Sequence, residues 1–386
     1  MQNILITGIG SISALGNNAV EIWENYQGNT TLISDCCLNN GDVKVGKLSA
    51  DSEQLIKDLR KEKIAYRKLD KSVIMSMLAS RKAVKNANWE HIENTAINIG
   101  PSRGATALFE KYHKHYLQTE KRLSPLSSPT TTLGNISSWV AMDLGSKGAT
   151  LSHSITCSTA LHSILNACAW IKSEMAEQFL AGGAEAPLTD FTIAQMQALG
   201  IYSKSSGDWP CNPLQKNKDK NSMILGEGAV VFALEKDKEQ KAMAKIIGLG
   251  FATEMIEHNA SLSAEAECMH NSMKMAMKDA ELSTIDTLVM HAPGTLQGDK
   301  AELKAITKIF GENMPHLIST KHLSGHTLGT SGALSIELAI MMLQHEKTIF
   351  FPYETIAHQN NNTPETIMIN AVGFGGNAVS IIIQKV

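Results

Sequence analysis

The sequence predicts an α/β protein made of two similar halves, each rich in strand–helix–strand units. Short apolar runs of strand length alternate with longer segments of helical periodicity, which is typical of this fold class. The order of these segments is similar in residues 1–236 and 237–386, although no strict sequence repeat is visible. The 386 residues also exceed the roughly 250–300 at which one hydrophobic core usually stops growing. We therefore expect two related halves that meet near Lys236.

The first half is expected to open with a buried strand at 3–7, a glycine-containing turn at 8–16 and a helix at 18–26. The turn nearly matches the dinucleotide-binding fingerprint, but Ser13 stands at its third glycine position and no acidic strand end follows. We interpret its glycines as tight-turn residues rather than nucleotide contacts. The later elements expected in this half are a helix at 73–87, a strand at 96–100, a polar loop at 123–132, a helix at 158–175, and strands at 178–183 and 226–236.

The second half repeats the alternation after a polar, Lys- and Asn-rich excursion at 202–222. Its expected elements are strands at 243–252, 286–291 and 316–320, helices at 262–281, 299–310 and 328–344, and paired strands at 366–372 and 378–385.

Composition and charge exclude several classes of protein. Hydrophobic residues make up 43% of the chain and charged residues 19%, the balance of an ordinary globular protein. The net charge of -3 gives no overall field that would attract nucleic acid or a membrane surface. The N-terminus lacks the features of a secretory signal, and no apolar run is long enough to span a membrane, so we expect a cytoplasmic protein. The six cysteines then predict no disulfide framework.

Cys157 is the first candidate for chemistry because it lies in SITCSTALHSIL, where an apolar strand meets a helix. Backbone N–H groups and the positive end of the helix dipole favour a thiolate at such a junction. A nucleophilic thiol there could accept an acyl group. A packed core cysteine is an equally good interpretation of this segment taken alone.

Two histidines and a lysine stand at comparable junctions. His291 ends an apolar strand, and Lys321 and His326 lie in a glycine-rich loop before a helix. Each feature alone is typical of a structural residue. Together with Cys157, they predict a convergent nucleophilic site.

Glycines 373, 375 and 376 surround Phe374 between two apolar strands. Such a turn can point backbone N–H groups into a cavity, which suits an oxyanion, or it can be a simple hairpin.

A metal site is the competing use of thiol and imidazole. His153 and Cys157 are four residues apart, but neither C-x-x-C nor H-E-x-x-H spacing occurs, so we expect no metal.

Taken together, these segments resemble the β-ketoacyl synthases, which are condensing enzymes of the thiolase-like fold. The resemblance spans essentially the whole chain, since TGIGSISALG near the start and GEGAVVFALE at 226–235 also look like family segments. The matching site residues are Cys157 in the nucleophile segment TCSTA, His291, Gly294, Thr295, Gly298, Asp299 and Glu302 in the first-histidine motif, Lys321, Gly325, His326 and Gly329 in the second, and residues 373–376 in the closing Gly-Phe-Gly-Gly.

The resemblance implies a five-layer αβαβα fold, with the nucleophile in residues 1–236 and both histidines in residues 237–386. It implies an acyltransferase, a β-ketoacyl-[acyl carrier protein] synthase in fatty-acid-like, polyene or polyketide biosynthesis. An acyl group would move from the phosphopantetheine arm of an acyl carrier protein to Cys157, followed by decarboxylative condensation with malonyl thioester. No organic cofactor or metal would be needed beyond that arm. The partners implied are the carrier protein and a second subunit, in a homodimer or in a heterodimer with a related ketosynthase.

The resemblance also implies a role for each remaining site residue. His291 and His326 would stabilise the enolate, and the N–H groups of Cys157 and Phe374 would bind the oxyanion. Lys321 would orient His326. Asp299 and Glu302 would form the surrounding polar shell.

Departures from the family pattern suggest a divergent synthase in a specialised pathway. Ala292 and Pro293 follow His291 where the family has Gly-Thr, and Ser335 stands where a glutamate is usual. Glu337 is close in sequence, but two residues along a helix place it on another face. The closing motif continues with Asn-Ala in place of Thr-Asn, and the 202–222 excursion lacks the family's Arg-Asp-Gly.

Two other functions remain open. The chain could be a chain-length-factor-like subunit without condensing activity, although such subunits typically lack the nucleophilic cysteine. It could act on coenzyme A thioesters as thiolases do, although their second active-site cysteine near the C-terminus has no counterpart after Cys268.

A basic ridge could dock an acidic carrier or could be a solvated helix face interleaved with acidic residues. The ridge consists of Arg60, Lys61, Lys63, Arg67, Lys68 and Lys71.

Overall fold

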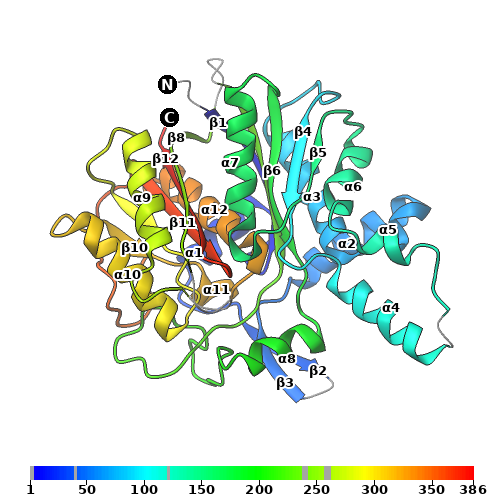
Figure 1. Cartoon of the computed structure of the whole chain (residues 1–386), viewed down its shortest axis with the longest axis horizontal. Coiled ribbons are helices and arrows are strands. Elements are labelled where there is room, and N and C mark those ends of the chain that lie inside the picture. The colour runs from blue at the N-terminus through cyan, green and yellow to red at the C-terminus, as the bar shows by residue number, and fades with distance from the viewer. Residues whose placement is uncertain (1–3, 39–40, 120–121, 237–241, 256–261) are drawn as a thin grey trace.

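Ten strands form one mixed sheet in the part of the chain that the computed structural model describes, residues 4–38, 41–119, 122–236, 242–255 and 262–386 (Figure 1). Their order across the sheet is β10-β9-β11-β12-β8-β1-β7-β6-β4-β5. The bounds are β1 Ile4–Ser13, β4 Ala96–Gly100, β5 Thr150–Leu151, β6 Gln178–Glu185, β7 Gly228–Lys236, β8 Ala244–Thr253, β9 Thr287–Val289, β10 His316–Ile318, β11 Thr366–Gly373 and β12 Asn377–Gln384.

The sheet consists of two five-stranded halves with the same topology. The order β1-β7-β6-β4-β5 in the first half corresponds to β8-β12-β11-β9-β10 in the second. In each half the first two pairings are antiparallel and the last two are parallel. A short antiparallel pairing of Ile4–Ile6 with Ala244–Ile246 joins them. The predicted pair of similar halves is therefore confirmed.

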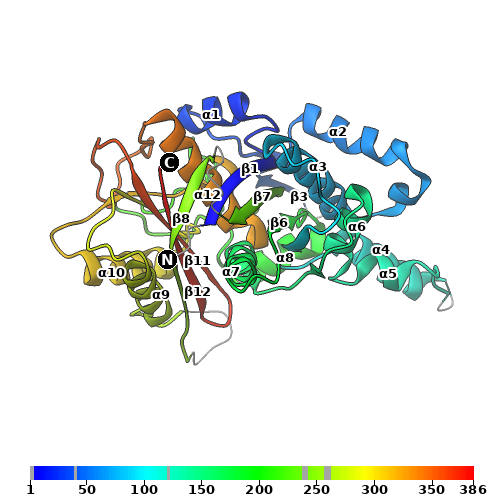
Figure 2. The same cartoon turned by 90° about the horizontal axis from the view of Figure 1, so that it is seen from above.

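Helices cover both faces of each half-sheet, which gives five layers (Figure 2). The central layer contains α7 (Thr159–Lys172) and α12 (Ser331–His345), which contact each other and the half-sheets on either side. Residues 331–343 of α12 are all buried, as expected for a helix enclosed on every side. The outer layers contain α3 (Lys71–Asn86) and α6 (Asn135–Leu144) on one side, and α9 (Glu267–Asp279) and α10 (Leu296–Phe310) on the other.

The remaining elements are short or lie outside the five layers. They are α1 (Ala19–Gln27), the hairpin of β2 (Ser34–Leu38) and β3 (Gly41–Val45), α2 (Ala50–Glu62), η1 (Ile64–Lys68), α4 (Thr106–Gln118), α5 (Ser127–Thr131), η2 (Thr156–Ser158), α8 (Asp190–Ala198), α11 (Lys321–Ser324) and η3 (Leu328–Thr330). Among them, α11 and η3 are fully buried. Figure 1 shows α4 and α5 forming an arm that projects away from the layered body. Within the described ranges, no helix is long and apolar enough to cross a membrane.

Two predicted loops are wrong. The turn expected at 8–16 is strand as far as Ser13, because Gly8 and Gly10 allow α3 to pack closely rather than turning the chain. A Cβ on Gly8 would lie 2.3 Å from the carbonyl oxygen of Ala83, and one on Gly10 would lie 1.9 Å from that of Ala79. The polar loop expected at 123–132 contains α5. Residue 3 of the first predicted strand and the boundary expected at 236/237, which falls on 237–241, lie outside the described residues.

Candidate active site

Cys157 lies in η2, a single turn that leads into α7, and only 6% of it is exposed. The residue before it, Thr156, has φ of +48°, which is unusual for a β-branched side chain. The Thr159 hydroxyl fixes this turn by donating to the Thr156 carbonyl at 2.7 Å and accepting from the Ile155 N–H at 2.9 Å. The chain therefore holds the thiol at a defined position in a strained turn.

The thiol is protonated in the free site. Burial, and secondarily the charge of Glu185, raises the pKa of Cys157 to about 12, while Lys321 acts in the opposite direction. Burial therefore opposes the thiolate that the helix N-terminus favours.

His291 follows β9, and His326 lies in the loop between α11 and η3. Their rings meet edge to face with centroids 5.2 Å apart, and both residues are buried. Burial, and then the charge of Lys321, lowers the pKa of His326 to about 3. Burial followed by the charges of His326 and Lys321 lowers the pKa of His291 well below 6.5. Both imidazoles are therefore neutral near pH 7, each keeping one N–H donor.

Glu302 fixes the backbone around His291. Its Oε1 accepts a hydrogen bond from the His291 N–H at 2.9 Å, and its Oε2 accepts one from the Ala292 N–H at 2.7 Å. The Asn370 amide donates to Oε1 at 3.2 Å. Burial raises the pKa of Glu302 to about 7 in spite of these donors. The Glu302 carboxylate thus contacts the main-chain N–H of His291.

The hairpin between β11 and β12 lies directly against the nucleophile. Gly375 and Gly376 have φ of +95° and +70°, which glycine adopts without strain. A Cβ on Gly373 would lie 1.9 Å from Thr156 Oγ1 and 3.3 Å from the Cys157 nitrogen, so only glycine fits there. The Thr156 hydroxyl donates to the Phe374 carbonyl at 3.4 Å. The structure therefore brings the backbone of Phe374 to the side of the cavity where Cys157 lies.

One cavity of about 340 Å³ joins these groups. Cys157, His291, His326, Glu302 and Phe374 all line it, although they come from both halves of the chain. The rest of the wall is mainly apolar, as in many sites for small molecules. The apolar lining side chains are Met196, Leu199, Ile201, Met223, Leu262, Met269, Pro293, Leu328 and Val372.

Residues 1–240 match the family model described as the β-ketoacyl synthase N-terminal domain. The chain belongs to the β-ketoacyl synthase family. Residues 243–350 match the model of the C-terminal domain of that family. As a member, this synthase is an acyltransferase of the condensing type.

Curated relatives and solved structures extend over the whole synthase. It is 28% identical over 419 residues to 3-oxoacyl-[acyl-carrier-protein] synthase 2 of Staphylococcus aureus (strain COL), covering 100% of this chain and 98% of the relative. The ishigamide ketosynthase/chain length factor has a TM-score of 0.88 at 18% identity, covering 100% and 99% of the two chains. AntDE:AntF, a type II PKS acyl-carrier protein in complex with its ketosynthase, has a TM-score of 0.85 at 20% identity and full coverage of both chains. These structural matches confirm the predicted thiolase-like fold.

Lys321 is enclosed behind the histidines of the synthase and is 1% exposed. Its Nζ donates to the Met290 carbonyl at 3.5 Å and to Ser335 Oγ at 3.4 Å. Burial lowers the pKa of Lys321 to about 8, against the opposing charge of Glu302. Glu337, as predicted, faces elsewhere and accepts a hydrogen bond from Tyr26 at 3.1 Å. A neutral hydroxyl therefore contacts the lysine where the family pattern has a carboxylate.

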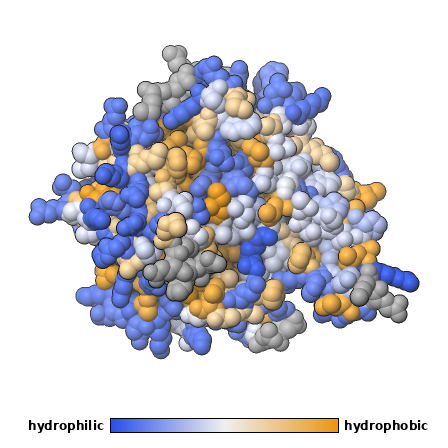
Figure 3. All heavy atoms as spheres, in the orientation of Figure 1, coloured by the Kyte–Doolittle hydropathy of each residue, from blue (hydrophilic) through white to orange (hydrophobic). Residues whose placement is uncertain are grey.

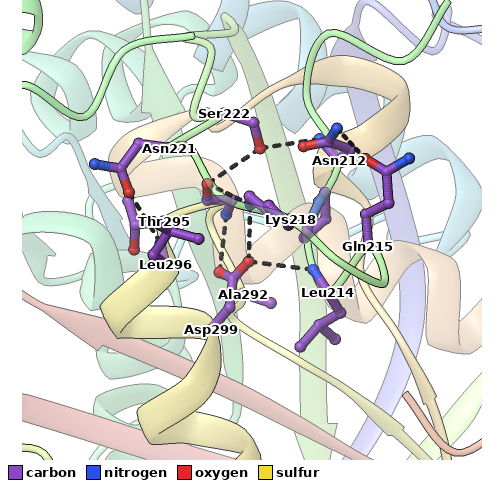
Figure 4. A network of polar contacts seen from close by, with 12 residues as sticks. Asn212, Leu214, Gln215, Lys218, Asn221, Ser222, Ala292, Thr295, Leu296 and Asp299 are labelled. Atoms are coloured by element: carbon purple, nitrogen blue, oxygen red, sulfur yellow. Dashed lines mark hydrogen bonds and ion pairs between the residues drawn. The ribbon is translucent and has the colours of Figure 1, made fainter. Parts of the chain in front are cut away.

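Asp299 contacts the turn that follows His291. Its Oδ1 accepts from the Gly294 N–H at 3.0 Å, and its Oδ2 accepts from the Leu214 N–H at 3.2 Å (Figure 4). Lys218 Nζ lies 3.3 Å from Oδ2. Asp299 therefore holds the turn after His291 rather than an imidazole.

Two buried charged residues of the synthase have no signal in the sequence. Glu185 ends β6 and accepts from the N–H groups of Ser102 at 2.6 Å, Arg103 at 3.1 Å and Gly329 at 3.1 Å. Burial raises the pKa of Glu185 to about 7. Lys218 belongs to the polar, Lys- and Asn-rich excursion at 202–222, yet its side chain is only 8% exposed. Only contacts between distant segments distinguish these residues from their neighbours.

Proposed function

We propose that this β-ketoacyl synthase takes an acyl group from an acyl carrier protein onto Cys157 and condenses it with a malonyl thioester. The decisive observation is that a buried thiol and two neutral imidazoles, contributed by different halves, line one cavity. The name of the Staphylococcus aureus relative and the AntDE:AntF complex support a carrier protein as the acyl donor. The departures at Ala292, Pro293 and Ser335 favour a polyketide or polyene pathway over housekeeping fatty-acid elongation.

The first step is acyl transfer. The Cys157 sulfur attacks the thioester carbonyl, the carrier's C–S bond breaks, and the carrier leaves as a free thiol. Because the Cys157 thiol is protonated at rest, its proton passes to the leaving sulfur in the course of the step. The N–H groups of Cys157 and Phe374 bind the oxyanion formed on the way.

The second step is decarboxylative condensation. The malonyl thioester loses carbon dioxide, and the electron pair of the broken C–C bond passes into an enolate whose oxygen accepts N–H hydrogen bonds from His291 and His326. The enolate carbon attacks the acyl-Cys157 carbonyl, forming the new C–C bond and expelling the Cys157 sulfur as a thiolate, which takes up a proton from water to restore the thiol. Lys321 lowers the pKa of both histidines. The chemistry uses no organic cofactor or metal beyond the carrier's phosphopantetheine arm.

The test is the intact mass of the purified protein after incubation with a panel of acyl-carrier thioesters and then malonyl-carrier, beside Cys157→Ala. We expect a mass gain that the variant lacks, followed by release of a β-ketoacyl product. A folded protein that shows no acylation across the panel would overturn the proposal. It would favour the second candidate, a partner subunit of another ketosynthase, which the structural likeness to a ketosynthase/chain length factor brings forward.

A second subunit of the same fold is expected to cover the arm and the adjacent sheet edge. β5 is the outermost strand at that edge, and Leu151 in it is 38% exposed. Exposed apolar side chains continue along α4 to α6 at Phe109, Leu117, Leu126 and Met142. Figure 3 shows hydrophobic patches on this side of the molecule. Light scattering after gel filtration distinguishes a homodimer from a chain that dimerises only with a related ketosynthase.

The basic ridge is narrower than the sequence suggested. Lys71 is paired with Glu53 and Glu227, and Arg60 donates to the Leu69 carbonyl at 3.0 Å. The exposed members are Lys61, Lys63, Arg67 and Lys68. We propose that these four help to dock the acidic carrier. Carrier binding that is insensitive to salt and unchanged by Arg67→Glu with Lys68→Glu would contradict this.

A further inference from the structure

The loop at 212–222 rests on the turn that follows His291 (Figure 4). The Gly294 carbonyl oxygen accepts hydrogen bonds from Lys218 Nζ at 2.6 Å and from the Ser222 N–H at 2.8 Å. Ser222 Oγ lies 3.1 Å from the same oxygen. Three donors thus converge on one buried carbonyl group, one of them a charged ammonium that forms a stronger hydrogen bond than a neutral donor.

Asp299 holds the other side of the same glycine. Its Oδ1 accepts from the Gly294 N–H, while its Oδ2 lies 3.3 Å from Lys218 Nζ. The side chains of Lys218 and Asp299 are 8% and 5% exposed, so solvent screens this ion pair little. Lys218 and Asp299 therefore hold Gly294 at both its carbonyl oxygen and its N–H group.

Gly294 has a backbone conformation and a close contact that both require glycine. Its φ is +92°, in the region that favours glycine. A Cβ there would lie 2.9 Å from Ser222 Oγ. The turn can therefore lie this close to the loop only because residue 294 has no side chain.

The turn held in this way forms one wall of the cavity. Pro293 and Thr295 line the cavity on either side of Gly294. Asn221, also in the wall, accepts a hydrogen bond from the Leu296 N–H at 2.9 Å and donates to the Gly200 carbonyl at 3.0 Å. Cys157 is positioned by different elements, namely η2, α7 and the hairpin at 373–376. Movement of the wall at 293–295 would thus displace the approach to His291 more than the nucleophile.

We propose that Lys218 is a positioning residue for the malonyl thioester, an inference that rests on the proposed condensation. Through Gly294 and Asp299 it fixes the wall beside His291, where the second substrate must lie while it loses carbon dioxide. Without the ammonium, the wall relaxes and the malonyl group no longer aligns with the histidine. Loading of Cys157, the earlier step, does not require this alignment.

The experiment compares Lys218→Met and Lys218→Arg with wild type and with Arg81→Met. Arg81 is a matched control because it also forms ion pairs with carboxylates, those of Glu62 and Asp143. It lies on α3, in an outer layer. Each protein is assayed for the rate of Cys157 acylation by intact mass, for KM and kcat toward malonyl-carrier, and for thermal unfolding. If Lys218→Met does not fold, Ser222→Ala, which removes one donor from Gly294, replaces it.

We expect Lys218→Met to acylate Cys157 within about twofold of wild type and to lose roughly 10- to 100-fold in kcat/KM for malonyl-carrier, the scale of a misplacement near 1 Å. Lys218→Arg should recover most of this loss, and Ser222→Ala should show a smaller split in the same direction. Equal losses in acylation and condensation, no loss in either, or the same split in Arg81→Met would overturn the proposal. A wild-type protein that never acylates Cys157 would instead refute the proposed function.

Discussion

Alkylation of Cys157 should become fast only at an unusually high pH. Burial raises the pKa of this thiol from 9.0 to about 12, which corresponds to about 4 kcal/mol against the thiolate. At a pH near 8, the thiolate fraction is then about a thousandfold lower than that of an ordinary thiol. The more basic thiolate is the better nucleophile, with a Brønsted coefficient of about 0.4–0.5, so the net reaction should be roughly 30- to 60-fold slower.

The assay is the rate of iodoacetamide labelling at Cys157, followed by peptide mass spectrometry across the alkaline range. Cys157→Ala identifies the peptide, and exposed Cys37 reports reagent activity in the same sample. The rate should climb about tenfold per pH unit to at least pH 10, because only the deprotonated thiol reacts. A plateau below about pH 9 would show that the helix N-terminus outweighs burial, and would refute the reasoning. Slow access of iodoacetamide to the thiol would lower the labelling rate at every pH without changing the pH at which the rate levels off.

Three further outcomes are expected. Gly373→Ala should slow acylation of Cys157 by about tenfold or more, because the new Cβ would overlap Thr156 and the chain beside the nucleophile must move; an unchanged acylation rate would contradict the tight contact. Glu302→Gln should lower the free energy of unfolding by about 1–3 kcal/mol, since one amide oxygen cannot replace two carboxylate oxygens on the N–H groups of His291 and Ala292; urea denaturation measures it. Burial raises the pKa of Glu337 from 4.5 to about 7, so the folded state binds this proton more tightly than the unfolded chain and stability is lost as pH rises from about 4.5 to 7. Glu337→Gln should therefore flatten the fall in unfolding free energy over that window by up to about 3 kcal/mol, and an unchanged slope would contradict the raised pKa.

The fold followed from the sequence because its signals are local. Apolar strand runs and amphipathic helices alternate in a similar order twice, which predicts two similar halves, whereas the five-layer arrangement followed from the family resemblance. The errors arose where a residue type has two physical uses. In sequence Gly8 and Gly10 fit a tight turn, whereas in the structure the absence of their side chains lets α3 approach an uninterrupted strand.

The site was predictable only in part for a similar reason. The local pattern singles out Cys157, His291 and His326, although only His291 closely follows a strand: Cys157 lies in η2, and His326 lies between α11 and η3. The protonation of the thiol depends on how completely the surrounding chain excludes water, and no local pattern reports that. Lys218 and Glu185 are buried because distant segments fold over them, so their neighbours in sequence carry no trace of it.

The division of the site between the two halves has a consequence for the chain as it is synthesised. Residues up to 236 emerge first and carry Cys157, whereas both imidazoles and the hairpin at 373–376 come much later. A chain that stops within the first half would therefore carry the thiol without either imidazole or the hairpin. If Cys157 is acylated as proposed, such a chain should not be trapped as an acyl adduct, because the groups proposed to load the thiol are missing.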